Sequence, residues 1–194
     1  MKKESLMLVS DWAKKVFVEN LWENEMGRAI GLSYFKERGF TPQIIQKFDL
    51  GYALDGWDNF NKSAKTAGYQ EDILLKAGLI LQKEGEPERV YDRFRNRVTF
   101  TIHNVSGKAI GFGARILTKD KNQPKYINSP ETPIYHKGDV LYGMFQAKKA
   151  IRGEQVQKQM KQRGISMVEP KREWNGERRE DKSSSRWWTP MNAN

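Results

Sequence analysis

Cysteine is absent from the 194 residues, and histidine occurs only as His103 and His136. The lack of cysteine excludes disulfide bridges, thiolate zinc sites and cysteine nucleophiles. Two histidines cannot make a histidine-rich metal site, so a metal ion would need carboxylate ligands. The carboxylates Asp92, Glu131 and Asp139 stand apart among basic and turn residues, whereas a pair of Mg²⁺ ions needs clustered acids. The sequence therefore predicts neither catalytic residues nor a metal site on this chain.

Long apolar runs are also missing. The longest run near the N-terminus, residues 6–9, is too short for a signal-peptide core or a membrane span, so we expect a cytoplasmic protein without a membrane partner. Positive charge is plentiful, because 34 Lys and Arg residues outnumber 24 Asp and Glu residues and give a formal net charge of +10. This excess favours an anionic partner such as nucleic acid, although a solvated basic surface would have the same composition.

The composition changes near residue 150. Apolar residues recur throughout residues 1–150, whereas residues 151–194 are mainly Lys, Arg, Gln, Glu and Ser. The aromatic content, 9 Phe, 7 Tyr and 6 Trp in the whole chain, is sufficient for a hydrophobic core. We therefore predict one domain over residues 1–150 and a charged, mostly disordered tail over residues 151–194, with a helix over residues 154–163.

Hydrophobic periodicity predicts an α+β fold, with N-terminal helices followed by a mainly antiparallel, basic β-sheet. Helices are expected over residues 6–21, 27–37, 42–48, 58–67 and 70–77, the third with Thr41 as its N-cap and Pro42 at its first position. Strands are expected over residues 49–54, 79–82, 97–104, 109–117 and 125–128, separated by turns at 84–87, 106–108 and 119–124. Within residues 97–104, apolar residues alternate with Thr99, Thr101 and His103, as in a strand with one apolar face.

Residues 91–143 interleave cations with aromatic residues. Cations can follow the phosphates of a single strand while ring faces stack on its bases, so the pattern suits single-stranded nucleic acid. A basic outer sheet face over a Phe-rich core would give the same pattern, and composition leaves both interpretations open. Gly111 and Gly113 precede no helix, which excludes a dinucleotide-binding or Walker loop. His136 has no carboxylate or serine partner in motif spacing, which favours a structural role over a catalytic one.

Four motifs in this region, taken in order, resemble bacterial DNA primases of the DnaG type. They are YDRFRNRV at 91–98, IGFGAR at 110–115, KYINSPET at 125–132 and HKGDVLYG at 136–143. YFKERGF at 34–40, LGYA at 50–53 and GWDN at 56–59 extend the resemblance over residues 10–150. In that family the segment is the N-terminal lobe of the RNA-polymerase core, between a zinc-binding domain and a TOPRIM domain that supplies the acidic metal site.

The resemblance ends at residue 150, where RGEQVQKQMKQRG replaces an apolar strand ending in Glu-Gly. We therefore expect a truncated or frame-shifted gene product, or a short form whose TOPRIM domain is on another chain. The implied function is that of a DNA primase core fragment, a nucleotidyltransferase in RNA primer synthesis during DNA replication within the primosome. The alternative is a catalytically inactive module that binds single-stranded nucleic acid, or a remnant without the TOPRIM metal site.

The resemblance also implies two sets of binding residues. A basic ridge on this lobe guides the template strand in such primases, which assigns DNA contacts to Arg38, Arg93, Arg95 and Arg97. The nucleotide side of the cleft would hold Arg115, Lys125, Tyr126, Asn128 and Lys137. The alternative role of Arg93 and Arg97 is an ion pair within the fold, since Asp92 is close in sequence. The expected partners are single-stranded DNA and ribonucleoside triphosphates, with the replicative helicase or a separate TOPRIM chain as further candidates, and Mg²⁺ or Mn²⁺ is expected only with a TOPRIM domain.

Overall fold

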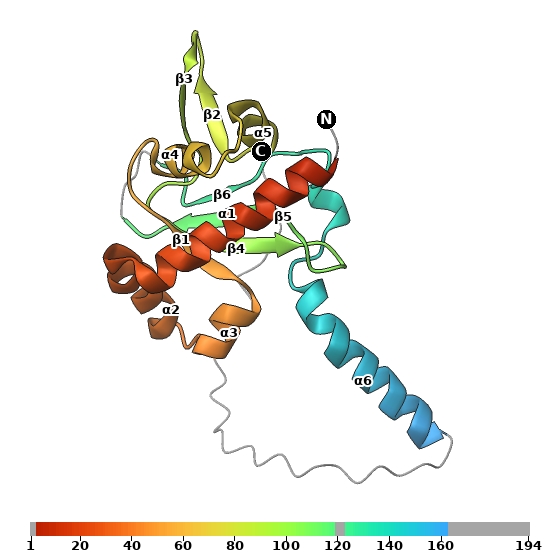
Figure 1. Cartoon of the computed structure of the whole chain (residues 1–194). Coiled ribbons are helices and arrows are strands. Elements are labelled where there is room, and N and C mark those ends of the chain that lie inside the picture. Colours follow the sequence, from red (N-terminus) through yellow and green to blue (C-terminus); the bar gives the residue numbers. More distant parts are fainter. Residues whose placement is uncertain (1–2, 119–122, 163–194) are drawn as a thin grey trace. The chain divides into compact units, whose positions relative to one another are not determined.

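The computed structural model describes residues 3–118 and 123–162 and confirms the α+β class (Figure 1). The chain divides into two units, residues 1–153 and residues 154–194, and the elements that follow lie in the first unit except for the end of the last helix. The helices are α1 (Lys3–Glu23), the π-helical η1 (Gly27–Leu32), α2 (Ser33–Glu37), α3 (Pro42–Lys47), α4 (Asn59–Thr66), α5 (Glu71–Lys76), the 3₁₀ turn η2 (Lys137–Asp139) and α6 (Met144–Gln162). The strands are β1 (Leu50–Ala53), β2 (Ile80–Lys83), β3 (Glu86–Asp92), β4 (Arg97–His103), β5 (Ala109–Ile116) and β6 (Tyr126–Asn128).

Four strands form the main antiparallel sheet in the order β1-β4-β5-β6. Directly paired residues lie on the same face of a sheet. One row across the sheet runs through Tyr52, Val98, Arg115 and Tyr126, each paired with the next. Strand pairing thus places Arg115 beside Tyr126, although eleven positions of sequence numbering separate them.

Helix α1 covers one face of this sheet. Its buried residues include Val9, Ala13 and Phe17, whose spacing places them along a single helix face. The helix approaches β1 closely at Gly51, where a Cβ atom would lie 2.6 Å from the carbonyl carbon of Phe17. Glycine at this position therefore allows the backbones of helix and strand to come into contact.

Both faces of β4 are buried, so its alternating sequence does not mark an exposed face. Thr101 is paired with Phe112, and the ring of Phe112 lies 5.2 Å from that of Phe17 on α1. On the opposite face Val98 packs in a cluster with Phe35 of α2 and Ile45 of α3. The threonines are thus enclosed because helices lie over both sides of the strand, which local periodicity does not report.

Strands β2 and β3 form a separate two-stranded antiparallel sheet, which Figure 1 shows extending away from the main sheet. Strand β3 is a departure from the sequence prediction, which assigned residues 84–87 to a turn and no strand to residues 86–92. Its sequence, EPERVYD, has no apolar alternation and is largely exposed. Pairing with β2, and not burial of an apolar face, therefore defines this strand.

Helix α6 begins ten residues before the helix predicted for residues 154–163. Gly143, with a φ of 79°, ends the preceding turn, and Gln146 then packs back onto the sheet by donating to Nδ1 of His103 at 3.0 Å. The ring of Phe145 lies 5.9 Å from that of His103. These contacts stabilise the first turns of a helix whose polar sequence lacked a clear apolar stripe.

Two other sequence predictions are only partly covered by the structure. The disorder predicted for the tail falls largely on residues 163–194, outside the described residues, and the domain boundary at residue 150 stays a prediction. Across residues 3–118 and 123–162, no helix is long and apolar enough to cross a membrane. The cytoplasmic location stays a prediction.

Candidate nucleic-acid interface

The first cation–aromatic group, the Arg115 cluster, consists of Tyr34, Arg38, Arg115, Lys125 and Tyr126. The guanidinium carbon of Arg115 lies 5.0 Å from the ring centre of Tyr34 and 5.6 Å from that of Tyr126. Arg115 also donates a hydrogen bond to the hydroxyl of Tyr34. The guanidinium carbon of Arg38 lies 3.9 Å from the ring centre of Tyr34, and Nζ of Lys125 lies 5.9 Å from the ring centre of Tyr126. Positive charge and ring faces are therefore held together at this edge of the sheet.

Three members of the predicted nucleotide-binding set, Arg115, Lys125 and Tyr126, thus lie in one cluster. Arg38, which was predicted to bind DNA, joins them through Tyr34 rather than standing with the other arginines. The sequence analysis did not identify Tyr34 as a site residue, although it lies in the YFKERGF motif. Tyr34 contacts the guanidinium groups of both Arg38 and Arg115 only because the chain folds α2 next to β5.

Arg97 holds the segment that precedes β6. Its side chain is buried, with 3% exposure, and Nη1 donates to the carbonyl of Pro124 at 2.9 Å and to that of Lys125 at 3.4 Å. Burial, together with the nearby charge of Arg95, lowers the pKa of Arg97. The predicted DNA contact at Arg97 therefore has no exposed guanidinium to support it.

Arg93 is half-buried and joins the end of β3 to β6. Its Nε and Nη2 atoms donate to the carbonyl of Asn128 at 3.1 and 2.9 Å. The amide side chain of Asn128 lies beside Gly113, where a Cβ atom would be 3.1 Å from Oδ1. Within the described ranges neither Arg93 nor Arg97 is ion-paired with Asp92, and both arginines bind carbonyl oxygens.

A second group, the Trp57 cluster, consists of Trp57, Tyr91 and Arg95. The guanidinium carbon of Arg95 lies 4.3 Å from the ring centre of Trp57 and 5.2 Å from that of Tyr91. Trp57 is 68% exposed, an unusual state for so large an apolar ring. Trp57 was not among the predicted site residues, although the GWDN motif that contains it was a recognisable signal.

Asp92 contacts the Trp57 cluster through main-chain hydrogen bonds to Trp57 and Arg95. Its carboxylate accepts hydrogen bonds from the backbone N–H groups of Phe60 and Asn61, at 2.7 and 2.9 Å, and so caps helix α4. Burial raises the pKa of Asp92 from 3.8 to about 6, against the opposing effect of these two hydrogen bonds. The carboxylate is thus engaged by two backbone N–H groups of α4 and holds the fold.

Lys137, the remaining predicted nucleotide contact, is exposed on the separate turn η2. Glu131 organises this turn, because its two oxygens bind the backbone N–H of Lys137 at 3.0 Å and Nδ1 of His136 at 2.9 Å. The Lys137 amide and His136 together lower the pKa of Glu131. His136 therefore does have a carboxylate partner, five residues upstream, which motif spacing did not show.

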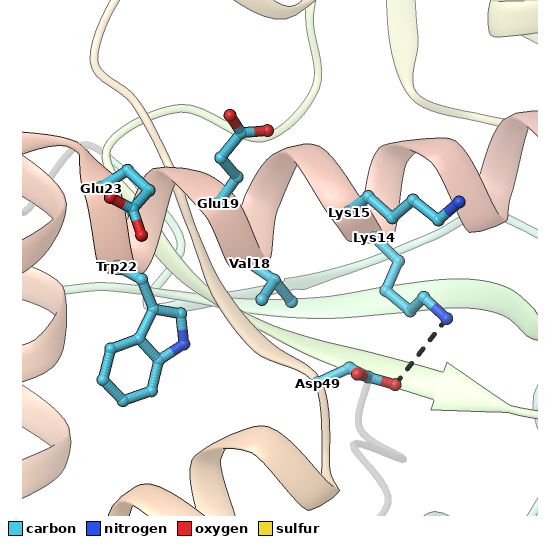
Figure 2. A pocket seen from close by; sticks show the side chains of 7 residues that line it. All are labelled: Lys14, Lys15, Val18, Glu19, Trp22, Glu23 and Asp49. Atoms are coloured by element: carbon cyan, nitrogen blue, oxygen red, sulfur yellow. Dashed lines mark ion pairs between the residues drawn. The ribbon is translucent and has the colours of Figure 1, made fainter.

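A shallow groove of about 480 Å³ runs along α1 (Figure 2). It contains no predicted site residue, and its charges are mixed, since two lysines and three carboxylates line it: Lys14, Lys15, Val18, Glu19, Trp22, Glu23 and Asp49. Lys14 is 3.9 Å from the carboxylate of Asp49. A groove of both signs is a poor match for a polyanion. In the part of the chain that the structure describes, no three His, Asp or Glu side chains gather as a metal site would require.

The fold and the two clusters define a basic α+β domain with cation–aromatic groups on its surface. Residues 16–148 match the family model described as the DNA primase catalytic core, N-terminal domain. The chain therefore belongs to the DNA primase family, through the N-terminal domain of the catalytic core.

Individual relatives agree with this assignment. The DNA primase of Halalkalibacterium halodurans is 45% identical over 157 residues, which cover 78% of this chain and 25% of the relative, and that of Deinococcus radiodurans is 47% identical over 122 residues, which cover 63% and 21%. The crystal structure of a DNA primase domain from Pseudomonas aeruginosa superposes with a TM-score of 0.69 at 38% identity, covering 76% of this chain and 44% of that one.

A solved DnaG primase catalytic domain bound to ssDNA superposes with a TM-score of 0.66 at 35% identity, covering 76% of this chain and 44% of that one. The chain thus spans about a quarter of the length of the curated primases and under half of the solved domains that it matches.

Proposed function

We propose that residues 1–150 act as the N-terminal lobe of a primase core and bind single-stranded template DNA and ribonucleotides for RNA primer synthesis. The observation that carries the proposal is the pair of cation–aromatic clusters, because each combines positive charge for phosphates with ring faces for bases. Membership of the primase family supports it, as does the similarity to a DnaG catalytic domain that binds ssDNA.

The two clusters suit different parts of this task. The exposed ring of Trp57 offers a surface on which a template base can stack, and Arg95 beside it can bind a backbone phosphate. The Arg115 cluster, with Lys125 and Tyr126, suits a triphosphate and its base or ribose. Asn128 follows on the same strand, and Lys137 supplies a further positive charge from its own turn.

The described residues hold no set of carboxylates that could bind Mg²⁺ or Mn²⁺. In the proposal a TOPRIM domain supplies the metal site, and this lobe binds and orients DNA and nucleotide. The chain by itself should therefore bind without polymerising.

Fluorescence anisotropy of a labelled single-stranded oligonucleotide tests the DNA-binding part. The logarithm of the affinity should fall with the logarithm of salt by about 0.7 for each neutralised phosphate. Replacing Trp57 and Arg95 by Ala should weaken binding at least about tenfold, since stacking of one base contributes on the order of 1–3 kcal/mol. Lys83→Ala is the matched control. It removes an exposed lysine of the β2-β3 hairpin that is ion-paired with Glu86, and it should change the affinity little.

A second experiment separates a primase lobe from an inactive binding module. Primer synthesis on a template is measured with ribonucleotides and Mg²⁺, first with this chain and then after addition of a separately purified TOPRIM domain. Synthesis only in the combined reaction, lost in an Arg115→Ala, Lys125→Ala variant, is the expected result. DNA binding without synthesis in either reaction would favour the inactive module, and no binding even at low salt would refute the proposal.

A further inference from the structure

Asp92 is a buried acid that contacts helix α4, a tryptophan loop and an arginine at once. Its side chain is 2% exposed and caps α4 through Phe60 and Asn61. Asp58 occupies the N-cap position of that helix but makes no capping hydrogen bond with its side chain. The N-terminus of α4 is therefore held by a residue more than thirty positions away in sequence.

The main chain of Asp92 binds two members of the Trp57 cluster. Its N–H donates to the carbonyl of Trp57 at 2.7 Å, and its carbonyl accepts a hydrogen bond from Nη1 of Arg95. The loop that carries Trp57 leads directly into α4. Residue 92 thus holds the segment 57–61 at both ends, through the carbonyl of Trp57 and the N–H groups of Phe60 and Asn61. A shift of the Asp92 carboxylate would therefore disturb the position of Trp57 and the carbonyl that binds Arg95.

We propose that Asp92 is a positioning residue, which holds Trp57 and Arg95 in place for single-stranded DNA, and that protonation of its carboxyl group weakens this binding. The inference rests on the proposed function of the Trp57 cluster. An ionised carboxylate offers an acceptor oxygen to each of the two N–H groups. In a neutral carboxyl one of these oxygens becomes a hydroxyl, which is a donor and a weaker acceptor, so one of the two capping hydrogen bonds weakens.

Burial of Asp92 brings its titration into a range of pH at which the folded chain can be studied. Burial raises its pKa to about 6, and the nearby carboxylate of Asp58 also raises it, whereas Phe60, Asn61 and Arg95 lower it. A small cavity of about 60 Å³ beside it is lined mostly by apolar residues, and its polar side chains other than Asp92 are neutral: Asn20, Asn59 and Ser63. Protonation relieves the buried charge but removes part of the cap, so the fold persists while the cluster loses its anchor.

Anisotropy titrations with the full chain at several pH values test the proposal with Asp92→Asn, which is neutral at every pH. At about pH 7.5 the variant should bind single-stranded DNA about fivefold more weakly than the unmodified chain, because it lacks one of the two capping hydrogen bonds to α4. At about pH 5, where both side chains are neutral, the two affinities should agree within about twofold. The two proteins differ only at residue 92, so effects of pH on the rest of the chain cancel in this ratio.

Asp58→Asn is the matched control, since it removes a carboxylate at the same helix end without removing a capping bond. Its affinity at about pH 7.5 should be unchanged, and the pH at which its binding weakens should move slightly lower, because Asp58 raises the pKa of Asp92. A constant ratio of unmodified to Asp92→Asn affinity across this pH range would overturn the proposal.

Trp57→Ala keeps the test decisive if Asp92→Asn fails to fold. Because the carboxylate is proposed to act through Trp57, loss of the ring should reduce the fall in affinity between about pH 7.5 and pH 5. An equal fall in both proteins would show that the proton acts elsewhere. If the unmodified chain binds no DNA, the proposed function fails and the inference with it, whereas pH-independent binding refutes the inference alone.

Discussion

Neighbouring arginines in the YDRFRNRV motif have different surroundings. The guanidinium of Arg95 lies against the exposed ring of Trp57 and the half-buried ring of Tyr91, whereas that of Arg97 is buried against the carbonyls of residues 124 and 125. Alternate residues of an extended chain share a direction only while the strand is regular, and Asn96 interrupts it with a φ of 48°. One basic motif therefore supplies both a surface cation and a structural one.

These surroundings predict that alanine acts mainly on stability at Arg97 and mainly on DNA affinity at Arg95. Arg97→Ala should lower the free energy of unfolding by about 2 kcal/mol, because a buried side chain is lost together with its hydrogen bonds to the carbonyls of residues 124 and 125. Arg95→Ala should lower it by less than about 1 kcal/mol and act mainly on DNA affinity. Urea unfolding followed by circular dichroism measures the first effect and anisotropy the second. An Arg97→Ala variant with unchanged stability and lost DNA binding would show instead that Arg97 contacts DNA directly.

The raised pKa of Asp92 predicts a pH dependence of stability. Since the pKa is about 6 in the folded chain and 3.8 ordinarily, the folded state keeps this proton between those pH values while the unfolded chain loses it. Its contribution to stability should therefore decrease as the pH rises from about 4 to about 6 and be constant above. Urea unfolding of the unmodified chain relative to Asp92→Asn should show this decrease. An increase would mean that the capping bonds outweigh burial.

At the scale of elements, the contact between α1 and β1 depends on one glycine. A Cβ atom at Gly51 would lie 2.6 to 2.7 Å from backbone and side-chain atoms of Phe17. These atoms belong to a helix that packs along the sheet and cannot move alone. The close approach is thus a property of two elements that are distant in sequence.

Gly51→Ala should destabilise the domain by about 2 kcal/mol, as overpacking of a filled core does. Gly138→Ala is the control, because no atom lies within 4 Å of the Cβ position there. Thermal or urea unfolding of both variants measures the difference. Equal stability of the two variants would mean that α1 can move away from β1 at little cost.

At the scale of the first unit, the segment after η2 completes the core. The ring of Tyr142 lies 6.0 Å from that of Phe48, and burial raises the pKa of Tyr142. Gln146 reaches both His103 and the carbonyl of Lys47. Residues 141–153 therefore connect the start of α6 to β4 and to the loop before β1.

A chain ending at Val140 should be less stable than one ending at Gly153 by about 3 kcal/mol, because it lacks Tyr142, Phe145 and Gln146 and leaves their partners exposed. Urea unfolding of the two truncated chains provides the comparison. Equal stabilities would mean that residues 141–153 do not contribute to the stability of the domain.

Local signals were sufficient for much of the fold. Thr41 and Pro42 predicted the start of α3, and Thr41 does accept a hydrogen bond from the N–H of Ile44. Gly78, with a φ of 66°, follows α5 as expected of a residue that ends a helix. The motif order predicted the primase family, which the match over residues 16–148 confirms. The individual roles in DNA and nucleotide binding stay predictions.

The sequence by itself thus determined charge, the lack of cysteine chemistry, most helices and strands, and the family, because these depend on composition and near neighbours. Tertiary structure alone decided that Arg97 is buried, that Trp57 meets Arg95 and that Asp92 caps a helix starting at Asn59. Each of these results from groups brought together by packing and strand pairing across long stretches of chain. Local periodicity carries no record of such contacts, since it reports which face of an element is apolar and not which partner covers it.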